Sequence, residues 1–347
     1  NGLIFASELK GLTCMARESN MPLSINPQSV YNYLYLLYVP QPDTIYKNVH
    51  SVPPGHSLYF DGENVKIQSY WNADFSEKLN LSYEDAVEQT KDKLSGEERI
   101  RLRSDVDIGL FLSGGIDSSV VAYEATKHSP KSLTAYTVSL EDKSLDESKI
   151  AAITAKQLGI KLEPINLRLS PNEDLMRVIK CYDQPYADSS AIPSLAVSTQ
   201  ASKDTKVVLT GDGGDEIFSG YRRHLAACYF DKLRFFPKAM SRALAATLAI
   251  LPSNRRSSIG FAKRFARGLY SSREQRYLTW NTDTLFEDDK KPYWNSTPVN
   301  PTEEFVSKYY PKDLDGPDAY QYADIHLNLL NDQLVKVDIS TMANSIE

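Results

Sequence analysis

The chain has 347 residues, of which 41% are hydrophobic, and this is enough for a large core and favours two or more domains. Lys and Arg number 39 against 45 Asp and Glu, so the formal net charge is -6, which argues against a dedicated nucleic-acid surface. The three cysteines are widely spaced without a CxxC pair, which argues against a disulfide framework or a zinc site and indicates a reducing, cytoplasmic compartment.

Residues 1–75 form the first compositional block. The stretch "GLIFAS" predicts a strand that leads into a short helix. Residues 26–38, "NPQSVYNYLYLLY", predict a helix capped by Asn26, and its aromatic side chains favour a core or interdomain stripe over a platform for stacking bases. The stretch "HSLYFDGENVKIQSYW" alternates around a turn and predicts a β-hairpin.

From about residue 81 the sequence alternates between helix and strand patterns. The first helix is expected to start at a Ser82 cap, and later helices to start at Asp117 and to end at Gly159. Strands separated by helices predict an α/β fold with a doubly wound parallel sheet, and beyond Tyr221 the pattern is nearly all helical. The predicted strands are residues 106–112, 133–140, 160–167 and 206–210.

Two later stretches allow less specific predictions. Residues 243–251, "ALAATLAIL", are too short to cross a membrane, and prolines on either side of them predict a core helix. Residues 255–270 carry basic side chains at helical spacings, which suit a nucleic-acid surface but more often form a solvated helix face. These basic residues are Arg255, Arg256, Lys263, Arg264 and Arg267.

The stretch "FLSGGIDSS" follows the first predicted strand of the sheet. Gly114 and Gly115 let the backbone approach a ligand, and the amides opening the next helix form an anion site. A carboxylate beside a bound phosphate is repulsive, so Asp117 suggests a bridging Mg²⁺. The alternative is that Asp117 only caps a helix after a glycine turn. The hydroxyl groups available to phosphate oxygens are those of Ser113, Ser118 and Ser119.

The stretch "LTGDGGDEIFSGY" repeats this pattern at the end of a later strand. Three glycines open its backbone, while Asp212, Asp215 and Glu216 concentrate negative charge. Repulsion among these acids and Asp117 predicts that the pKa of at least one carboxylate is raised. An acidic surface turn or a calcium-type loop is the alternative. Because no Gly-Lys-Ser/Thr and no complete GxGxxG occurs, a P-loop GTPase site and a dehydrogenase site are excluded.

Together the two motifs resemble the synthetase domain of glutamine-dependent asparagine synthetases, members of the PP-loop ATP-pyrophosphatase (HUP-like) group. "FASELKGL" resembles the end of that family's glutaminase domain, and "LLNDQLVKVDISTMANSIE" resembles its helical C-terminal region. The resemblance implies that residues 1–75 are the end of a glutaminase-type domain plus a connecting hairpin. It also implies that residues 76–347 are an ATP-dependent synthetase domain with a helical C-terminal region.

The resemblance also implies a reaction. ATP would activate a small-molecule carboxylate, aspartate by default, as an acyl-adenylate with release of pyrophosphate, and ammonia derived from glutamine would then form the amide. The implied magnesium ligands are Asp117 and Asp215, and Asp212 stands where many members carry a catalytic Glu. The implied ATP-binding residues are Leu112, Ser113, Gly114, Gly115, Asp117, Ser118, Val138, Thr210 and Gly211.

The two ends of the chain depart from the family pattern. The family's glutaminase uses an N-terminal cysteine, whereas this chain begins at Asn1, and Cys14 lies after the "FASEL" element. The chain also stops at Glu347, before an Arg-containing segment and a lysine that the family uses. We therefore expect a longer protein whose N-terminal glutaminase domain supplies ammonia, and a homodimer, with no nucleic-acid or membrane partner.

Two alternative functions remain open. The same chemistry could serve another acceptor, because relatives close β-lactams, cyclise peptides or amidate sugar acids. A non-catalytic nucleotide-binding homologue is the other class, although three acids retained near a phosphate site argue against it.

Overall fold

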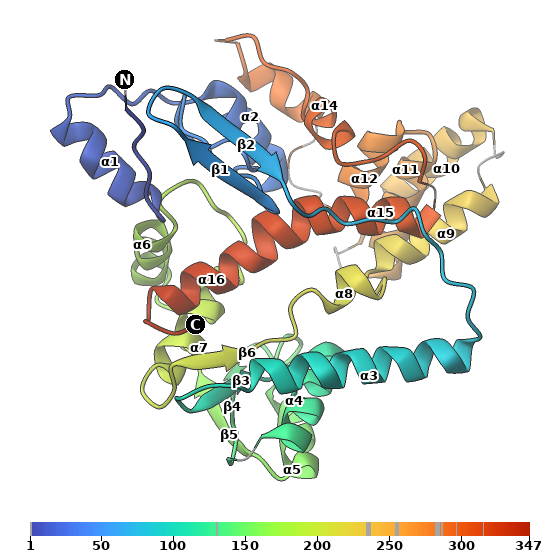
Figure 1. The fold of residues 1–347 in the computed structure, drawn as a ribbon. Helices are drawn as coiled ribbons and strands as arrows, with labels where there is room; N and C mark the ends of the chain where they lie inside the picture. The colour runs from blue at the N-terminus through green and yellow to red at the C-terminus, as the bar shows by residue number, and fades with distance from the viewer. Residues whose placement is uncertain are drawn as a thin grey trace. The chain divides into compact units, whose positions relative to one another are not determined.

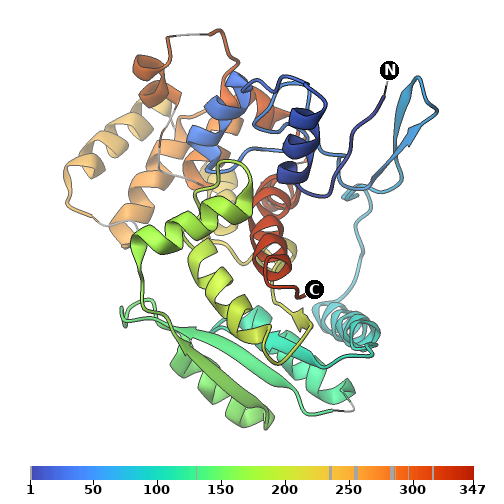
Figure 2. The ribbon, with the colours of Figure 1, turned by 90° about the vertical axis from the view of Figure 1, so that its left-hand side faces the viewer.

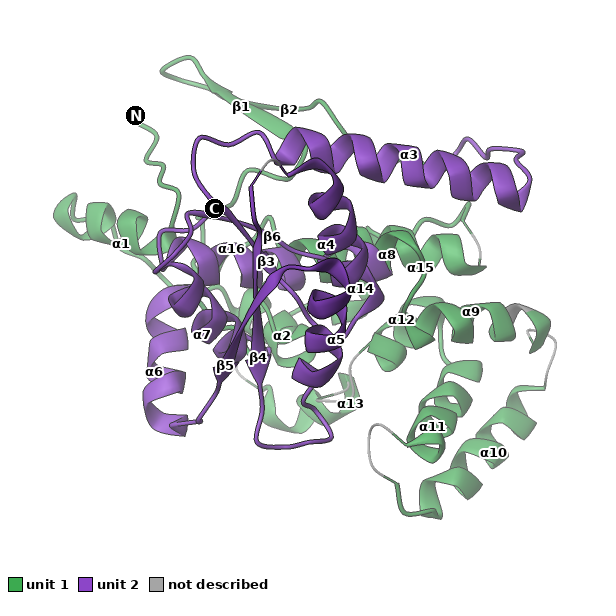
Figure 3. Ribbon diagram, turned by 90° about the horizontal axis from the view of Figure 1, so that it is seen from below, with its two compact units in different colours: residues 1–75, 183–187, 216–331 green, residues 76–182, 188–215, 332–347 purple. Residues whose placement is uncertain are grey.

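The computed structural model (Figure 1) describes residues 2–347 except 130, 234–236, 254–256, 282–284, 286, 296 and 315. The chain forms two compact units, each assembled from separate stretches of sequence (Figure 3). The unit that we call the helical unit contains residues 1–75, 183–187 and 216–331. The sheet unit contains residues 76–182, 188–215 and 332–347. The expected domain division after residue 75 remains a prediction.

The sheet unit is built on a parallel four-stranded sheet in the order β5-β4-β3-β6. Each strand lies within a range that the sequence predicts, so the α/β class is confirmed. The chain adds β4 and β5 on one side of β3 and then returns to its other side for β6. The carboxyl ends of β3 and β6 therefore flank the point where ligands bind in sheets of this kind. The strands are β3 (Ile108–Phe111), β4 (Thr134–Ser139), β5 (Lys161–Asn166) and β6 (Val207–Leu209).

Helices pack on both faces of this sheet (Figure 1). On one face, Leu110 of β3 lies in a core with Ala122 of α4 and Ala155 of α5. On the other face, Tyr136 of β4 packs with Ala201 of α7. This arrangement is that of an α/β fold, while membership of the PP-loop structural group remains a prediction. The helices of the sheet unit are α3 (Tyr83–Arg101), α4 (Ile116–His128), α5 (Ser148–Leu158), α6 (Pro171–Tyr182), α7 (Ala191–Ala201) and α16 (Leu334–Met342).

Local signals set several of these helix ends. The Ser82 side chain accepts a hydrogen bond from the backbone N–H of Asp85, as expected of an N-cap. Helix α4 begins one residue before the predicted Asp117, and α5 ends just before Gly159, which has the left-handed backbone typical of a helix C-cap.

The helical unit begins with α1 (Leu9–Glu18) and α2 (Pro27–Leu36), followed by the antiparallel hairpin of β1 (His56–Phe60) and β2 (Val65–Ser69). The hairpin was predicted, and it projects from its unit with every residue of β2 exposed (Figure 2). Helix α2 is also confirmed, because Asn26 accepts from the Gln28 amide.

The rest of the helical unit surrounds an aromatic core. Tyr35 of α2 is buried there with Tyr277, Tyr320 and Leu327, so the aromatic stripe of α2 is a core feature rather than a stacking platform. The remaining elements are α8 (Gly214–Ile217), which starts in the sheet unit, α9 (Arg222–Leu233), α10 (Lys238–Ile250), α11 (Ser258–Leu269), α12 (Arg273–Asn281), α13 (Glu287–Lys290), η1 (Lys291–Tyr293), α14 (Thr302–Ser307), α15 (Gly316–Asp324) and the π-helical η2 (Ile325–Gln333), which ends in the sheet unit.

Two sequence predictions are wrong. Residues 2–6 form no strand, because none of the described residues pairs with them. Residues 243–250 are helical as expected, but α10 is not a core helix, since Leu244 and Ile250 are 43% and 84% exposed. An apolar composition favours burial, but burial also requires a neighbouring element on every apolar side. Among the described residues, α11 is the element that packs extensively against α10, and it leaves the other apolar side chains of α10 exposed.

The basic stretch has a mixed environment. Arg267 is exposed, as a solvated face predicts. Lys263 is half-buried, and its ammonium donates to the carbonyl oxygens of Ala249 and Leu251 at the end of α10. Arg255 and Arg256 lie outside the described residues. Among the helices that the structure describes, none combines the length and the apolar character needed to span a bilayer.

Candidate active site

The loop after β3 is organised by its own hydroxyl groups. The Leu112 amide donates to the carbonyl oxygen of Tyr136 and so continues the pairing with β4. The Ser113 amide donates to Ser118 Oγ, and the Gly115 amide donates to Ser113 Oγ. Two of the predicted phosphate-binding serines thus hold the turn into α4 in this structure.

Two glycines after β6 lie against the first turn of α4, which follows the loop after β3. A Cβ atom on Gly211 would lie 2.5 Å from the Ser118 backbone nitrogen, and one on Gly214 would lie 2.4 Å from Asp117 Cγ. Only a residue without a side chain allows this approach. The two motifs therefore form one site within the sheet unit, although about ninety residues of sequence separate them.

Asp117 and Asp215 lie near enough at this contact to interact electrostatically. The pKa of Asp117 is raised from its ordinary value, first by burial and then by the negative charge of Asp215. A raised carboxylate pKa was predicted, and its second cause is the expected like-charge repulsion. Two neighbouring carboxylates are suited to a hard divalent cation. Among the described residues no cluster of three His, Cys, Asp or Glu side chains could hold a metal, so phosphate oxygens would have to supply further ligands.

Glu147 occupies part of the predicted anion site. The amide of Gly114 donates to Glu147 Oε2 at 3.0 Å. Glu147 immediately precedes α5, and its carboxylate lies on a backbone N–H that a phosphate oxygen would also use. This contact demonstrates that the glycine turn accepts an anionic oxygen.

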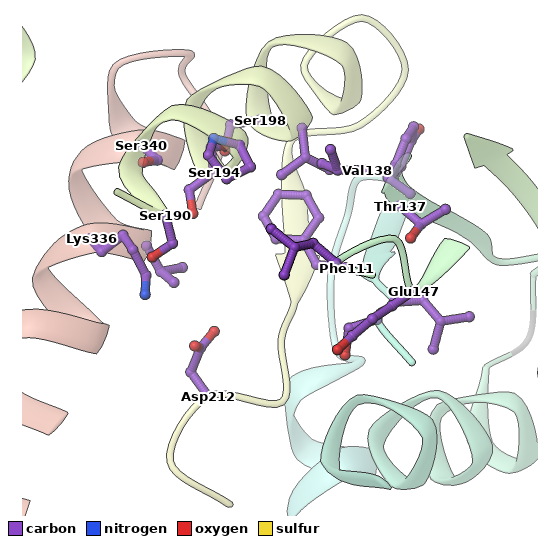
Figure 4. A pocket seen from close by; sticks show the side chains of 17 residues that line it. Phe111, Thr137, Val138, Glu147, Ser190, Ser194, Ser198, Asp212, Lys336 and Ser340 are labelled. Carbon is purple, nitrogen blue, oxygen red and sulfur yellow. The ribbon is translucent and has the colours of Figure 1, made fainter. Parts of the chain in front are cut away.

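A cavity of about 440 Å³ opens beside the two loops, within the usual size range of small-molecule sites (Figure 4). Leu112, Ser113, Val138 and Asp212 line it, so four of the predicted site residues meet there. The other predicted residues lie on the two loops or in the first turns of the helices that follow them, and they do not line this cavity: Gly114, Gly115, Asp117, Ser118, Thr210, Gly211 and Asp215. Thr210 Oγ1 accepts a 3.4 Å hydrogen bond from the Asp212 amide.

The opposite wall of the cavity was not predicted. It comes from α7 and α16, and its charged member is Lys336, whose ammonium points toward the same space as the Asp212 carboxylate (Figure 4). A lysine between apolar residues in the run "LVKV" (residues 334–337) was a signal that sequence reasoning could have used. The wall's hydroxyl groups are those of Ser190, Ser194, Ser198 and Ser340.

Comparison with known proteins identifies the family. The model of the asparagine synthase family matches residues 89–347, and that of the glutamine amidotransferase domain matches residues 1–71. The chain belongs to the asparagine synthase family. The resemblance seen in the two glycine-rich motifs is thereby confirmed.

Relatives within this family carry two kinds of name. Asparagine synthetase [glutamine-hydrolyzing] 1 of Bacillus subtilis is 30% identical over 99% of this chain and 53% of its own length. A putative asparagine synthetase [glutamine-hydrolyzing] 2 of Methanocaldococcus jannaschii is 34% identical over 69% of this chain and 46% of its own length. The amidase chyE of Penicillium rubens is 32% identical over 51% of this chain and 30% of its own length. The chain thus spans about half the length of the first of these relatives and less of the others.

Proposed function

We propose that this chain carries the synthetase activity of an ATP-dependent, AMP-forming amide ligase, with aspartate as the default acid and asparagine as its product. The observation that carries the proposal is the contact between the two glycine-rich loops at the ends of β3 and β6. It brings an anion-binding turn, a carboxylate pair and the Asp212 side chain to one end of the sheet. Membership of the asparagine synthase family supports the use of ATP.

The loop after β3 would bind the pyrophosphate portion of ATP. The amides of Gly114 and Gly115 and the N-terminus of α4 favour negative charge, and the Ser113 and Ser118 hydroxyl groups can turn to donate to it. Glu147 would have to leave the Gly114 amide when a phosphate oxygen arrives. The cavity surfaces of Leu112 and Val138 are suited to the adenine or ribose of the nucleotide.

Asp117 and Asp215 are the residues that would hold a magnesium ion. Their mutual repulsion fits a cation between them and a phosphate group. When bound, Mg²⁺ supplies positive charge that offsets the charge of the nucleotide phosphates. Because neither carboxylate lines the cavity, a magnesium ion held by them would lie beside the glycine turn.

In the first half of the reaction, an oxygen of the substrate carboxylate attacks the α-phosphorus of ATP, and pyrophosphate leaves. In the second half, ammonia attacks the acyl carbon, and AMP leaves with its bonding electron pair. Asp212 lines the cavity and is the carboxylate placed to accept a proton from the attacking ammonia. The amidotransferase match supports glutamine as the source of that ammonia. A homodimer and a cytoplasmic location are further parts of this proposal.

A different acid acceptor is the second candidate. The name of the Penicillium relative, an amidase, favours it, because that protein is similar to about half of this chain and is named for another activity. The chemistry of ATP would be unchanged, and only the acid bound in the cavity would differ.

The test uses the intact protein with ATP, ammonia and an acid labelled with ¹⁸O in its carboxylate. Adenylation transfers one label into AMP, because the bond between the carboxylate oxygen and phosphorus forms before the acyl carbon is attacked. We expect labelled AMP and pyrophosphate in equal amounts. Stoichiometric ADP and phosphate, or AMP without label, would contradict the proposal, and a reaction without acid is the control.

A further inference from the structure

Lys336 is a nearly buried cation on the wall of the cavity. It lies on α16, its residue is 7% exposed, and it lines the cavity together with Ser340 one turn further along the helix. A lysine that deep is costly unless its charge is paired or used. The reaction assigned above uses Asp212 and the two loops but gives Lys336 no role.

The Lys336 ammonium is held by two acceptors. Asp188 Oδ2 lies 3.0 Å and Gln333 Oε1 lies 2.6 Å from Nζ. An ammonium has three hydrogens, and among the described residues these are its two hydrogen-bond partners. One donor therefore remains, and the ammonium faces the space between α16 and the strand ends (Figure 4).

Asp188 is itself fixed from several sides. Its carboxylate accepts from the Ser190 amide and from the Ser190 hydroxyl as well as from Lys336. Asp188 does not line the cavity, whereas Lys336 and Ser190 do. The carboxylate of Asp188 thus lies away from the cavity, and the charge that a ligand in the cavity would contact is the positive charge of Lys336.

We propose that Lys336 determines acid specificity by binding a second anionic group of the substrate, one that is not adenylated. The inference rests on the proposed function. It assigns to the pocket an acid with two anionic groups and disfavours an acid whose only carboxylate is the one activated. The acidic side chains that line the same cavity, Asp212 and Glu147, would repel a second carboxylate, which leaves Lys336 as the cation able to bind it.

Serine hydroxyl groups complete this end of the cavity. Ser194 and Ser340 line it beside Lys336, and each can donate to an oxygen of the same group, whereas the Ser190 hydroxyl donates to Asp188. A carboxylate bound by one ammonium and neighbouring hydroxyl groups is oriented as well as neutralised. This arrangement provides selectivity, since an acid lacking the second carboxylate would leave the remaining donor of the Lys336 ammonium without an acceptor.

The test is carboxylate-dependent exchange of labelled pyrophosphate into ATP by the intact protein. Aspartate is compared with β-alanine, which is aspartate without its α-carboxylate. We expect Lys336→Gln to lower kcat/KM for aspartate about 100-fold, to leave that for β-alanine within about threefold, and to leave the KM for ATP nearly unchanged. Lys149→Gln, at an exposed position of α5, is the matched control and should change none of these values.

Each result decides a different question. An unchanged ratio of aspartate to β-alanine in Lys336→Gln overturns the role of Lys336 while leaving the proposed function intact. An absence of exchange with every acid in the unaltered protein overturns the proposed function itself. If Lys336→Gln does not fold, Asp188→Asn with Lys336→Gln removes both charges of the pair together, and the same comparison of acids is made with that variant.

Discussion

Asp212 and Asp215 are separated by two glycines, yet their side chains have different surroundings. Asp212 lines the cavity with Leu112 and Val138. Asp215 instead opposes Asp117 and raises its pKa. A residue in the cavity can act on the reacting groups, whereas a residue beside the glycine turn can act on the nucleotide phosphates. The two acids are therefore expected to respond differently to mutation.

Replacing Asp212 by Asn should impair the reaction more than the binding of nucleotide. The amide keeps the size of the side chain but cannot accept a proton from ammonia. We expect Mg-ATP affinity to stay within a few-fold and amide formation to fall about 100-fold or more. Calorimetry with Mg-ATP and a turnover assay on the same preparation check this. Lost Mg-ATP binding, or unaltered turnover, would show that the division of roles is wrong.

Replacing Asp117 by Ala should impair the binding of nucleotide. Without this carboxylate, one ligand of the expected cation is gone, and we expect the Kd of Mg-ATP to rise about 100-fold. Asp105→Ala, at an exposed position before β3, removes the same charge elsewhere in the unit and serves as control. Equal Mg-ATP affinity for Asp117→Ala and the control in calorimetry would exclude the loop after β3 as the phosphate site.

At the scale of elements, the site depends on how closely the loop after β6 approaches the start of α4. Gly211 lies against the backbone of Ser118, so a methyl group there cannot be relieved by turning a side chain. Gly96 in α3 provides the contrast, because a Cβ atom at that position would have open space around it.

Gly211→Ala should therefore destabilise the protein by about 1–3 kcal/mol and weaken nucleotide binding, since the two loops must move apart. Gly96→Ala should stabilise it by about 0.5–1 kcal/mol, because alanine suits a helix interior better than glycine. Urea unfolding and Mg-ATP titration of both variants check these expectations. A Gly211→Ala variant with unchanged stability and unchanged affinity would contradict the close contact.

At the scale of the whole molecule, the two units are stabilised by different means. The sheet unit buries small apolar residues between its sheet and helices, such as Ala122 and Ala155 against Leu110. The helical unit buries a charged group. Asp324 is 0% exposed and accepts from the Arg223 guanidinium and the His224 ring, each at 2.7 Å.

Asp324→Asn should destabilise the helical unit by about 3–5 kcal/mol, because it leaves Arg223 buried without its counter-charge. Burial alone would raise the pKa of Asp324, but Arg223 and His224 outweigh it and lower that pKa below its ordinary value of 3.8. The stabilisation is thus present above about pH 4 and is lost as the pH falls through the lower folded value. The difference in unfolding free energy between Asp324→Asn and the unaltered protein should shrink in acid.

Denaturant unfolding at pH 7 and at pH 3 measures this difference. The exposed Asp313 provides the control, and Asp313→Asn should change the free energy of unfolding by no more than about 0.5 kcal/mol at either pH. A destabilisation by Asp324→Asn that is equally small at pH 7 would show that the buried network contributes nothing.

The elements of the sheet unit were predictable because their signals are local. An apolar run of a few residues marks β3, a serine cap marks the start of α3, and glycine marks the end of α5. The two wrong predictions had suitable local sequences but lacked the neighbouring elements that a strand or a buried helix requires. Residues 2–6 look like a strand but have no neighbouring strand among the described residues, and α10 is apolar but largely exposed.

The chemical character of the site could likewise be derived from sequence, since glycines, serines and acids clustered after strands indicate phosphate and metal chemistry wherever the strands lie. Which groups meet could not be derived. Strand order brings the loops after β3 and β6 into contact, and the return of the chain through α16 places Lys336 opposite Asp212 in one cavity. Those contacts join residues more than ninety positions apart in the sequence, and no local propensity encodes which distant segments pack together; the free energy of burying both surfaces decides that.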